Sequence, residues 1–133
     1  MNSSVEYDKT GYFSFDAQHQ ELFDITDDLC RALDDCRAKG DVNMAFSFYE
    51  NYIKAHFGME ETLMKKKEFP DADEHMKEHR FFINRLKELI ASFENADDPT
   101  KWDGIEEVRY LLIEWSISHI ANDDKRLSQY IQG

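Results

Sequence analysis

Four segments of the sequence repeat apolar residues at the spacing of an α-helix, and this pattern constrains the fold more than any other feature. Helices are predicted at about residues 17–38, 42–66, 72–94 and 101–131. Each helix has one apolar face, and short connections join them. Such segments bury their faces best against one another, so we predict an all-α, antiparallel up-down-up-down four-helix bundle.

Helix ends were predicted from capping residues. The expected N-terminal caps are Asp16, Asp41, Asp71 and Thr100. Asp71 is expected to form a capping pair with Glu74, and Lys39-Gly40 is expected to end the first helix. Residues 1–15 lack a helical period but are rich in aromatic side chains, so we expect an extended N-terminal arm over the core. These aromatic residues are Tyr7, Tyr12, Phe13 and Phe15.

Length and charge limit the range of functions. A chain of 133 residues is expected to form one domain, residues 1–133, with one core. Its formal net charge of −12 argues against nucleic acid or an anionic membrane as a partner, although a basic partner protein remains compatible. The first 16 residues lack the basic start and apolar run of a secretory signal, which predicts a cytoplasmic protein. Cys30 and Cys36 are six residues apart and point in different directions on a helix, so free thiols are expected.

Two pairs of polar residues have the four-residue spacing that lets two side chains on one helix bind the same metal ion. His75 and His79 are four residues apart, which places their rings about 40° apart around the axis and about 6 Å apart along it. Both rings can therefore reach one metal ion, although two solvated histidines are the alternative. His56 and Glu60 have the same spacing within an apolar face. A buried carboxylate there needs a charged partner or a metal, unless Glu60 lies at the edge of the face and reaches water.

The remaining histidines also lie on apolar faces. His19 is in the first turn of the first helix, where a boundary residue without a ligand role is the alternative. Asp124 follows His119 by five residues, about 140° around a regular helix, so the two side chains would diverge. We predict a π-type bulge between them. The alternative is an Asp124 exposed to solvent.

In a bundle, these side chains would meet in the core. The candidate metal ligands are His19, His56, Glu60, His75, His79, His119 and Asp124. Seven ligands exceed the need of one zinc ion, and five imidazoles with two carboxylates suit a pair of borderline metals such as iron. If both carboxylates and an oxide or hydroxide bridge two six-coordinate metals, one coordination position stays open. Such a site would accept a small diatomic molecule.

The order and spacing of these residues resemble the hemerythrin family. The resemblance spans nearly the whole chain. The matching segments are Asp16-Ala17-Gln18-His19, His56-Phe57-Gly58-Met59-Glu60-Glu61, His75-x-x-x-His79 and Trp115-x-x-x-His119-Ile120-x-x-x-Asp124.

The resemblance implies reversible O2 binding at a non-haem di-iron centre, for oxygen storage, delivery, transport or scavenging. It implies two iron ions bridged by an oxo or hydroxo group and by Glu60 and Asp124. The other implied ligands are His75, His79 and His119 on one iron, with His19 and His56 on the second. The second iron would carry the open position.

The sequence departs from the family pattern at two positions. Tyr7 is found where family members commonly have Trp near the N-terminus, and Ser116 replaces the usual apolar residue after the Trp of the fourth helix. We expect Trp115 and Ser116 to line the O2 pocket. Our hypothesis is that the Ser116 hydroxyl contacts bound oxygen species or admits water, and so accelerates autoxidation. The alternative is a hydroxyl bonded to its own helix.

Other functions are compatible with the same ligands. They are O2 or redox sensing through a separate partner protein, di-iron peroxidase or oxidase activity, and iron or nitric oxide handling. Oxygen-activating bundles use mostly carboxylates, whereas this set is rich in histidine, so we do not expect an enzyme. Because the core uses each apolar face, we expect a monomer.

Overall fold

The computed structural model describes residues 10, 13–35 and 38–132. The described residues are helical with short connections and contain no strand. The first three helices are α1 (Phe13–Asp34), α2 (Lys39–Lys66) and α3 (Ala72–Glu94). A 3₁₀ turn at Pro99–Lys101 leads into the fourth helical rod. In order, its segments are α4 (Ile105–Arg109), π-helical Tyr110–Trp115, α5 (Ser116–His119), π-helical Ile120–Asp124 and α6 (Lys125–Gln132).

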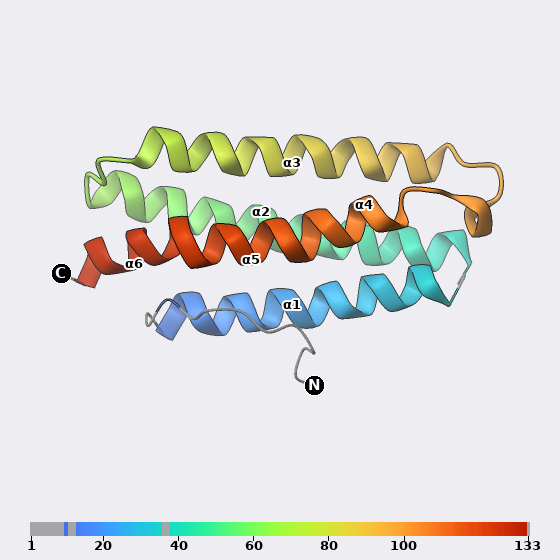
Figure 1. The fold of residues 1–133 in the computed structure, drawn as a ribbon, viewed down its shortest axis with the longest axis horizontal. Helices are drawn as coiled ribbons and strands as arrows, with labels where there is room; N and C mark the ends of the chain where they lie inside the picture. The colour runs from blue at the N-terminus through green and yellow to red at the C-terminus, as the bar shows by residue number, and fades with distance from the viewer. Residues whose placement is uncertain (1–9, 11–12, 36–37, 133) are drawn as a thin grey trace.

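The four rods lie side by side and alternate in direction (Figure 1). Contacts join α1 to α2, α2 to α3, and the fourth rod back to α1. The predicted all-α, up-down-up-down four-helix bundle is therefore confirmed. Within the described residues, no helix has the length and apolar character needed to cross a membrane.

Two clusters of apolar side chains make up the core. The larger one includes Phe57 and Leu86, and the smaller consists of Phe15, Met64, Phe69 and Leu127. Buried polar side chains lie between them. Phe57 of the larger cluster stacks on His79, while the Phe15 ring of the smaller cluster lies 6.2 Å from the His19 ring, measured between centroids. The candidate ligands are thus enclosed by apolar packing from both sides.

The first helix begins and ends four residues earlier than predicted. Asp16 lies inside α1, so it is not the N-cap of this helix. Its Oδ1 instead accepts hydrogen bonds from the Thr10 backbone N–H and hydroxyl, both at 2.8 Å. Phe13 and Phe15 belong to α1, so the predicted arm is wrong at these positions. Burial of Phe15 in the core favours this earlier start. Tyr7 and Tyr12 lie outside the described residues.

The connection between α1 and α2 also differs from the prediction. Lys39 and Gly40 are the first residues of α2, and Asp41 lies in its first turn rather than at the cap. The Lys39 ammonium donates hydrogen bonds to the carbonyl oxygens of Glu94 and Ala96, at 2.6 and 2.9 Å. This long-range contact ties the start of α2 to the end of α3, so Lys39 does not mark a stop.

The predicted cap of α3 is confirmed in position only. Asp71 is the N-cap residue, but its side chain makes no capping hydrogen bond. Glu74 instead pairs with Lys77 at 3.1 Å on the exposed surface. The expected capping pair between Asp71 and Glu74 is therefore wrong.

The fourth rod begins at Ile105, after the predicted start at residue 101. Thr100 lies in the 3₁₀ turn, where its N–H and hydroxyl donate to Oδ1 of Asp98 at 3.0 and 2.7 Å. Trp102 then packs its ring against Phe46 and Phe93 in the core. Burial of Trp102 delays the helix, which is why Thr100 is not its cap.

The predicted π-type turn between His119 and Asp124 is confirmed, because Ile120–Asp124 is π-helical. A wider turn rotates Asp124 back toward the face that carries His119. The second π-helical segment, Tyr110–Trp115, was not predicted. Cys30 is a buried free thiol as expected, and Cys36 lies outside the described residues.

Candidate metal centre

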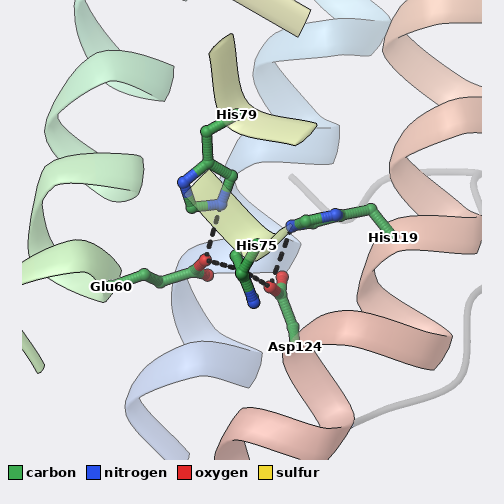
Figure 2. Close-up of side chains that lie close together, drawn as sticks. All are labelled: Glu60, His75, His79, His119 and Asp124. Carbon is green, nitrogen blue, oxygen red and sulfur yellow. Dashed lines mark hydrogen bonds and ion pairs between the residues drawn. The ribbon is translucent and has the colours of Figure 1, made fainter. Parts of the chain in front are cut away.

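Seven buried side chains from all four rods converge toward the end of the bundle where α3 begins. None of them is more than 5% exposed. They make two overlapping groups of potential metal ligands that share Glu60 and Asp124. The first group adds His75, His79 and His119, drawn in Figure 2, and the second adds His19 and His56. The structure therefore brings together every ligand candidate taken from the sequence.

Glu60 directs its two oxygens toward different groups. Its Oε1 lies 3.1 Å from Nε2 of both His75 and His79. Its Oε2 lies 2.7 Å from Nε2 of His56 and 3.8 Å from Nε2 of His19. The carboxylate therefore spans the two groups.

Asp124 has the same arrangement on the opposite rod. Its Oδ1 lies 3.1 Å from Nε2 of both His75 and His119, while its Oδ2 lies 3.0 Å from Nε2 of His19. Two carboxylates that each offer one oxygen to each group match the geometry of bridging ligands. The π-helical turn before Asp124 makes this orientation possible.

The donor atoms fit a cation better than they fit each other. Nε2 of His19 and Nε2 of His56 face each other at 3.1 Å. Four more inward atoms are buried without a hydrogen bond of suitable geometry: Glu60 Oε2, His79 Nε2, His119 Nε2 and Asp124 Oδ1. Unpaired buried polar atoms are costly, and a bound cation would satisfy all of them. Imidazole nitrogen with carboxylate oxygen is a donor set suited to iron and similar metals.

Electrostatic coupling between the carboxylates and histidines is strong. Burial lowers the pKa of His19, but Asp124 and Glu60 outweigh it and raise this pKa to about 9. The same balance raises the pKa of His75 to about 9. Burial raises the pKa of Glu60, yet His56 and the other histidines hold it well below its usual range. Both carboxylates therefore stabilise positive charge on the histidines.

Three histidines are held in place through their second ring nitrogen. His56 Nδ1 lies 2.7 Å from Gln18 Oε1, and His79 Nδ1 lies 2.9 Å from Glu61 Oε2. His119 Nδ1 lies 3.2 Å from a carboxylate oxygen of Glu78 and 3.1 Å from one of Asp123. Such contacts fix the ring and the tautomer that binds a metal through Nε2.

No role for these supporting residues was predicted from the sequence. A signal was nevertheless available. Each of them is the chain neighbour of a candidate ligand, and together they contact His56, His79 and His119. The four neighbouring pairs are Gln18-His19, Glu60-Glu61, Glu78-His79 and Asp123-Asp124.

Comparison with known proteins agrees with this geometry. The family described as the Hemerythrin HHE cation binding domain matches residues 10–131. The chain belongs to the hemerythrin family. It is 31% identical over 117 residues to a bacteriohemerythrin of Pseudomonas aeruginosa, covering 86% of this chain and 71% of the relative. A bacteriohemerythrin of Methylococcus capsulatus is 28% identical over 113 residues, covering 83% and 80%. One from Stenotrophomonas maltophilia is 26% identical over 117 residues, covering 88% and 72%.

Two aromatic rings stack on histidines of this hemerythrin domain. The Trp115 ring lies on His119, with centroids 4.7 Å apart and planes 9° apart. The Phe57 ring lies on His79, with centroids 3.8 Å apart and planes 7° apart. Both stacked histidines belong to the three-histidine group. These two rings are thus held by stacking as well as by carboxylates.

A small cavity of about 10 Å³ adjoins the two-histidine group. The wall includes His19 and His56, and it also includes His119 and Asp124. Trp115, Ser116 and apolar side chains such as Leu22 and Ile53 complete it. A volume of this size holds about one water-sized molecule. The structure therefore places both residues expected at the O2 pocket in one cavity wall. Ser116 is 4% exposed, and the buried Tyr49 hydroxyl lies beside it.

Proposed function

We propose that this hemerythrin-family chain binds O2 reversibly at a non-haem di-iron centre, for storage, delivery or scavenging. One observation carries the proposal: two groups of buried ligands share Glu60 and Asp124, and each carboxylate offers one oxygen to each group. A single metal ion would leave one of the groups unused. The relatives named bacteriohemerythrin support the same function.

The proposed ligands divide unequally between the two metals. His75, His79 and His119 would hold one iron, while His19 and His56 would hold the other. Glu60 and Asp124 would bridge them together with an oxo or hydroxo group. When bound, the iron pair supplies the electrons for reversible O2 binding. The iron with only two histidines would keep one position open, and the small cavity adjoins these two histidines.

The cavity wall selects the ligand by size and polarity. Leu22, Ile53, Phe57 and Ile120 supply apolar surface, which keeps bulk water away. A space of about 10 Å³ is the size of a single water molecule, so an organic substrate is too large for it. Binding without turnover is therefore the favoured activity.

A redox cycle tests the proposal. Metal-free protein is loaded with Fe²⁺ without oxygen, and bound iron is counted by elemental analysis. Exposure to O2 should produce visible charge-transfer bands, and removal of O2 should abolish them over repeated cycles. One iron per chain, or bands that never form, would contradict the proposal. A pure sensor would show the same cycle, so its partner protein must be sought separately.

Peroxidase or oxidase activity is the second candidate. The Ser116 hydroxyl is an observation in its favour, because it brings a polar group to the cavity wall beside Tyr49. Such a group could assist proton transfer. Irreversible oxidation by O2, with turnover of added peroxide, would favour this enzyme over the carrier. Cytoplasmic location and the monomeric state stay predictions from the sequence.

A further inference from the structure

Each histidine of the metal centre is at least 95% buried, so a metal ion needs a route from the surface to reach it. Two surface cavities extend to a candidate ligand. One, of about 360 Å³, is lined by His75, and another, of about 230 Å³, is lined by His79. Both are large enough for a hydrated cation. Their charges distinguish them.

The cavity at His75 is strongly acidic. Four carboxylates line it, from Asp71, Glu74, Glu78 and Asp123, against the guanidinium of Arg126 and the imidazole of His75. The cavity at His79 has the opposite balance, with Lys54 and Arg80 against Glu61. An acidic cavity concentrates divalent cations near the centre, whereas a basic one repels them. Carboxylate oxygen is also a suitable transient ligand for such ions.

His75 and Phe69 are the buried residues that line the acidic cavity, and His75 is the candidate ligand of the two. It is 3% exposed, and its Nε2 faces Glu60 and Asp124 (Figure 2). Within the part of the chain that the structure describes, no carboxylate or amide binds its Nδ1. His56, His79 and His119 are instead fixed through Nδ1. The second nitrogen of the His75 ring therefore lacks the contact that restrains those three, and His75 is one of the residues that line the cavity.

We propose that the acidic cavity is the metal-loading port of the centre. Its carboxylates capture a divalent cation, Fe²⁺ in the function proposed above, and rotation of the His75 ring lets the ion pass to Glu60 and Asp124. Arg126 moderates the capture, because it pairs with Asp123 and reduces the negative charge. This inference rests on the proposed metal centre, but it concerns the rate of loading rather than O2 binding.

The test compares two double variants by stopped-flow absorbance. Metal-free protein is mixed with Co²⁺, whose visible bands report binding without oxidation. Asp71→Asn with Glu74→Gln removes two charges from the port, both on exposed side chains outside the candidate ligands. Asp97→Asn with Glu106→Gln removes two exposed charges, one from the connection between α3 and α4 and one from the first turn of α4. That connection lies at the end of the bundle opposite to the start of α3 (Figure 1). This control changes the net charge equally.

We expect the port variant to take up Co²⁺ roughly 3- to 10-fold more slowly, with a weaker dependence on salt and the same final stoichiometry. The control variant should stay within about 2-fold of the unmodified chain. Arg126→Gln should accelerate uptake, a gain that misfolding would not produce. Equal rates in both double variants, or no gain in Arg126→Gln, would overturn the port.

The outcomes separate the port from the proposed function. Failure of the unmodified chain to bind Co²⁺ would overturn the metal centre and the port together. Normal Co²⁺ binding with equal rates in all variants would overturn the port alone. A chain that loads through the port but never binds O2 reversibly would overturn the proposed function and leave the port supported.

Discussion

The two histidine groups differ in how firmly the protein holds them. In the three-histidine group, carboxylates contact Nδ1 of His79 and His119, and aromatic rings stack on both. In the two-histidine group, His56 Nδ1 contacts the neutral amide of Gln18, and a small cavity adjoins both rings. Carboxylate contacts make imidazole more basic and fix its orientation. His79 and His119 are therefore held more firmly than His56, whereas His75 has no such contact at Nδ1.

The shared carboxylates provide the most severe test of this comparison. Glu60→Ala should reduce bound iron from two ions per chain to one or none, because Glu60 is the only glutamate that contacts both groups among the described residues. Elemental analysis and the loss of visible bands after O2 addition measure the effect. Glu50→Ala is the control, because Glu50 is a half-buried glutamate of the same helix that pairs with Lys54 at 3.2 Å and belongs to neither ligand group. A Glu60→Ala protein that retains two irons and the same spectrum would disprove the ligand assignment.

The contacts at Nδ1 provide the next largest effect. Glu78→Gln with Asp123→Asn should weaken metal binding by about 10- to 100-fold, because His119 loses both carboxylates that orient it. Competition with a chelator measures the affinity. Gln18→Leu should have a smaller effect, because the amide it removes carries no charge. Equal losses in the two variants would show that the groups are held equally well.

Substitutions of Ser116 test the role of the small cavity that adjoins His19 and His56. Ser116→Leu should slow autoxidation of the oxygenated protein several-fold, because an apolar side chain excludes water and removes a hydroxyl from the cavity wall. The smaller Ser116→Ala change should act in the same direction if Leu proves too large. Ser118→Leu, at an exposed position of the same rod, is the control. The rate is followed as decay of the visible bands, and an unchanged rate in both Ser116 variants would refute the hypothesis.

The smallest expected effect is on the stability of the metal-free protein. The pKa values of His19 and His75 rise from 6.5 to about 9 on folding, so their protonated forms stabilise the folded state below pH 6.5. This stabilisation is lost as the pH rises toward 9. The Tm of the metal-free protein should therefore fall by several degrees between pH 6.5 and 9. The loaded protein should show a smaller fall, because the metal excludes those protons. Equal pH dependence with and without metal would contradict this coupling.

The local pattern of the sequence was sufficient for the bundle and for the ligand candidates. Helical periodicity depends on near neighbours, so the four rods and their buried faces were predicted. The five-residue gap between His119 and Asp124 likewise indicated a widened turn, because no regular helix places both on one face. Helix starts were less predictable. Thr10 binds Asp16, and Trp102 enters the core before α4, and both contacts depend on tertiary packing.

By itself, the sequence determined which side chains would face the core and that their donor atoms suit a metal pair. The tertiary structure decided which oxygen of Glu60 and Asp124 faces which histidine. It also decided that Glu61, Glu78 and Asp123 fix the histidines while an acidic cavity ends at His75. The reason is physical. Burial follows from a periodic pattern within one helix, whereas hydrogen-bond partners and cavities depend on how separate helices are placed against one another.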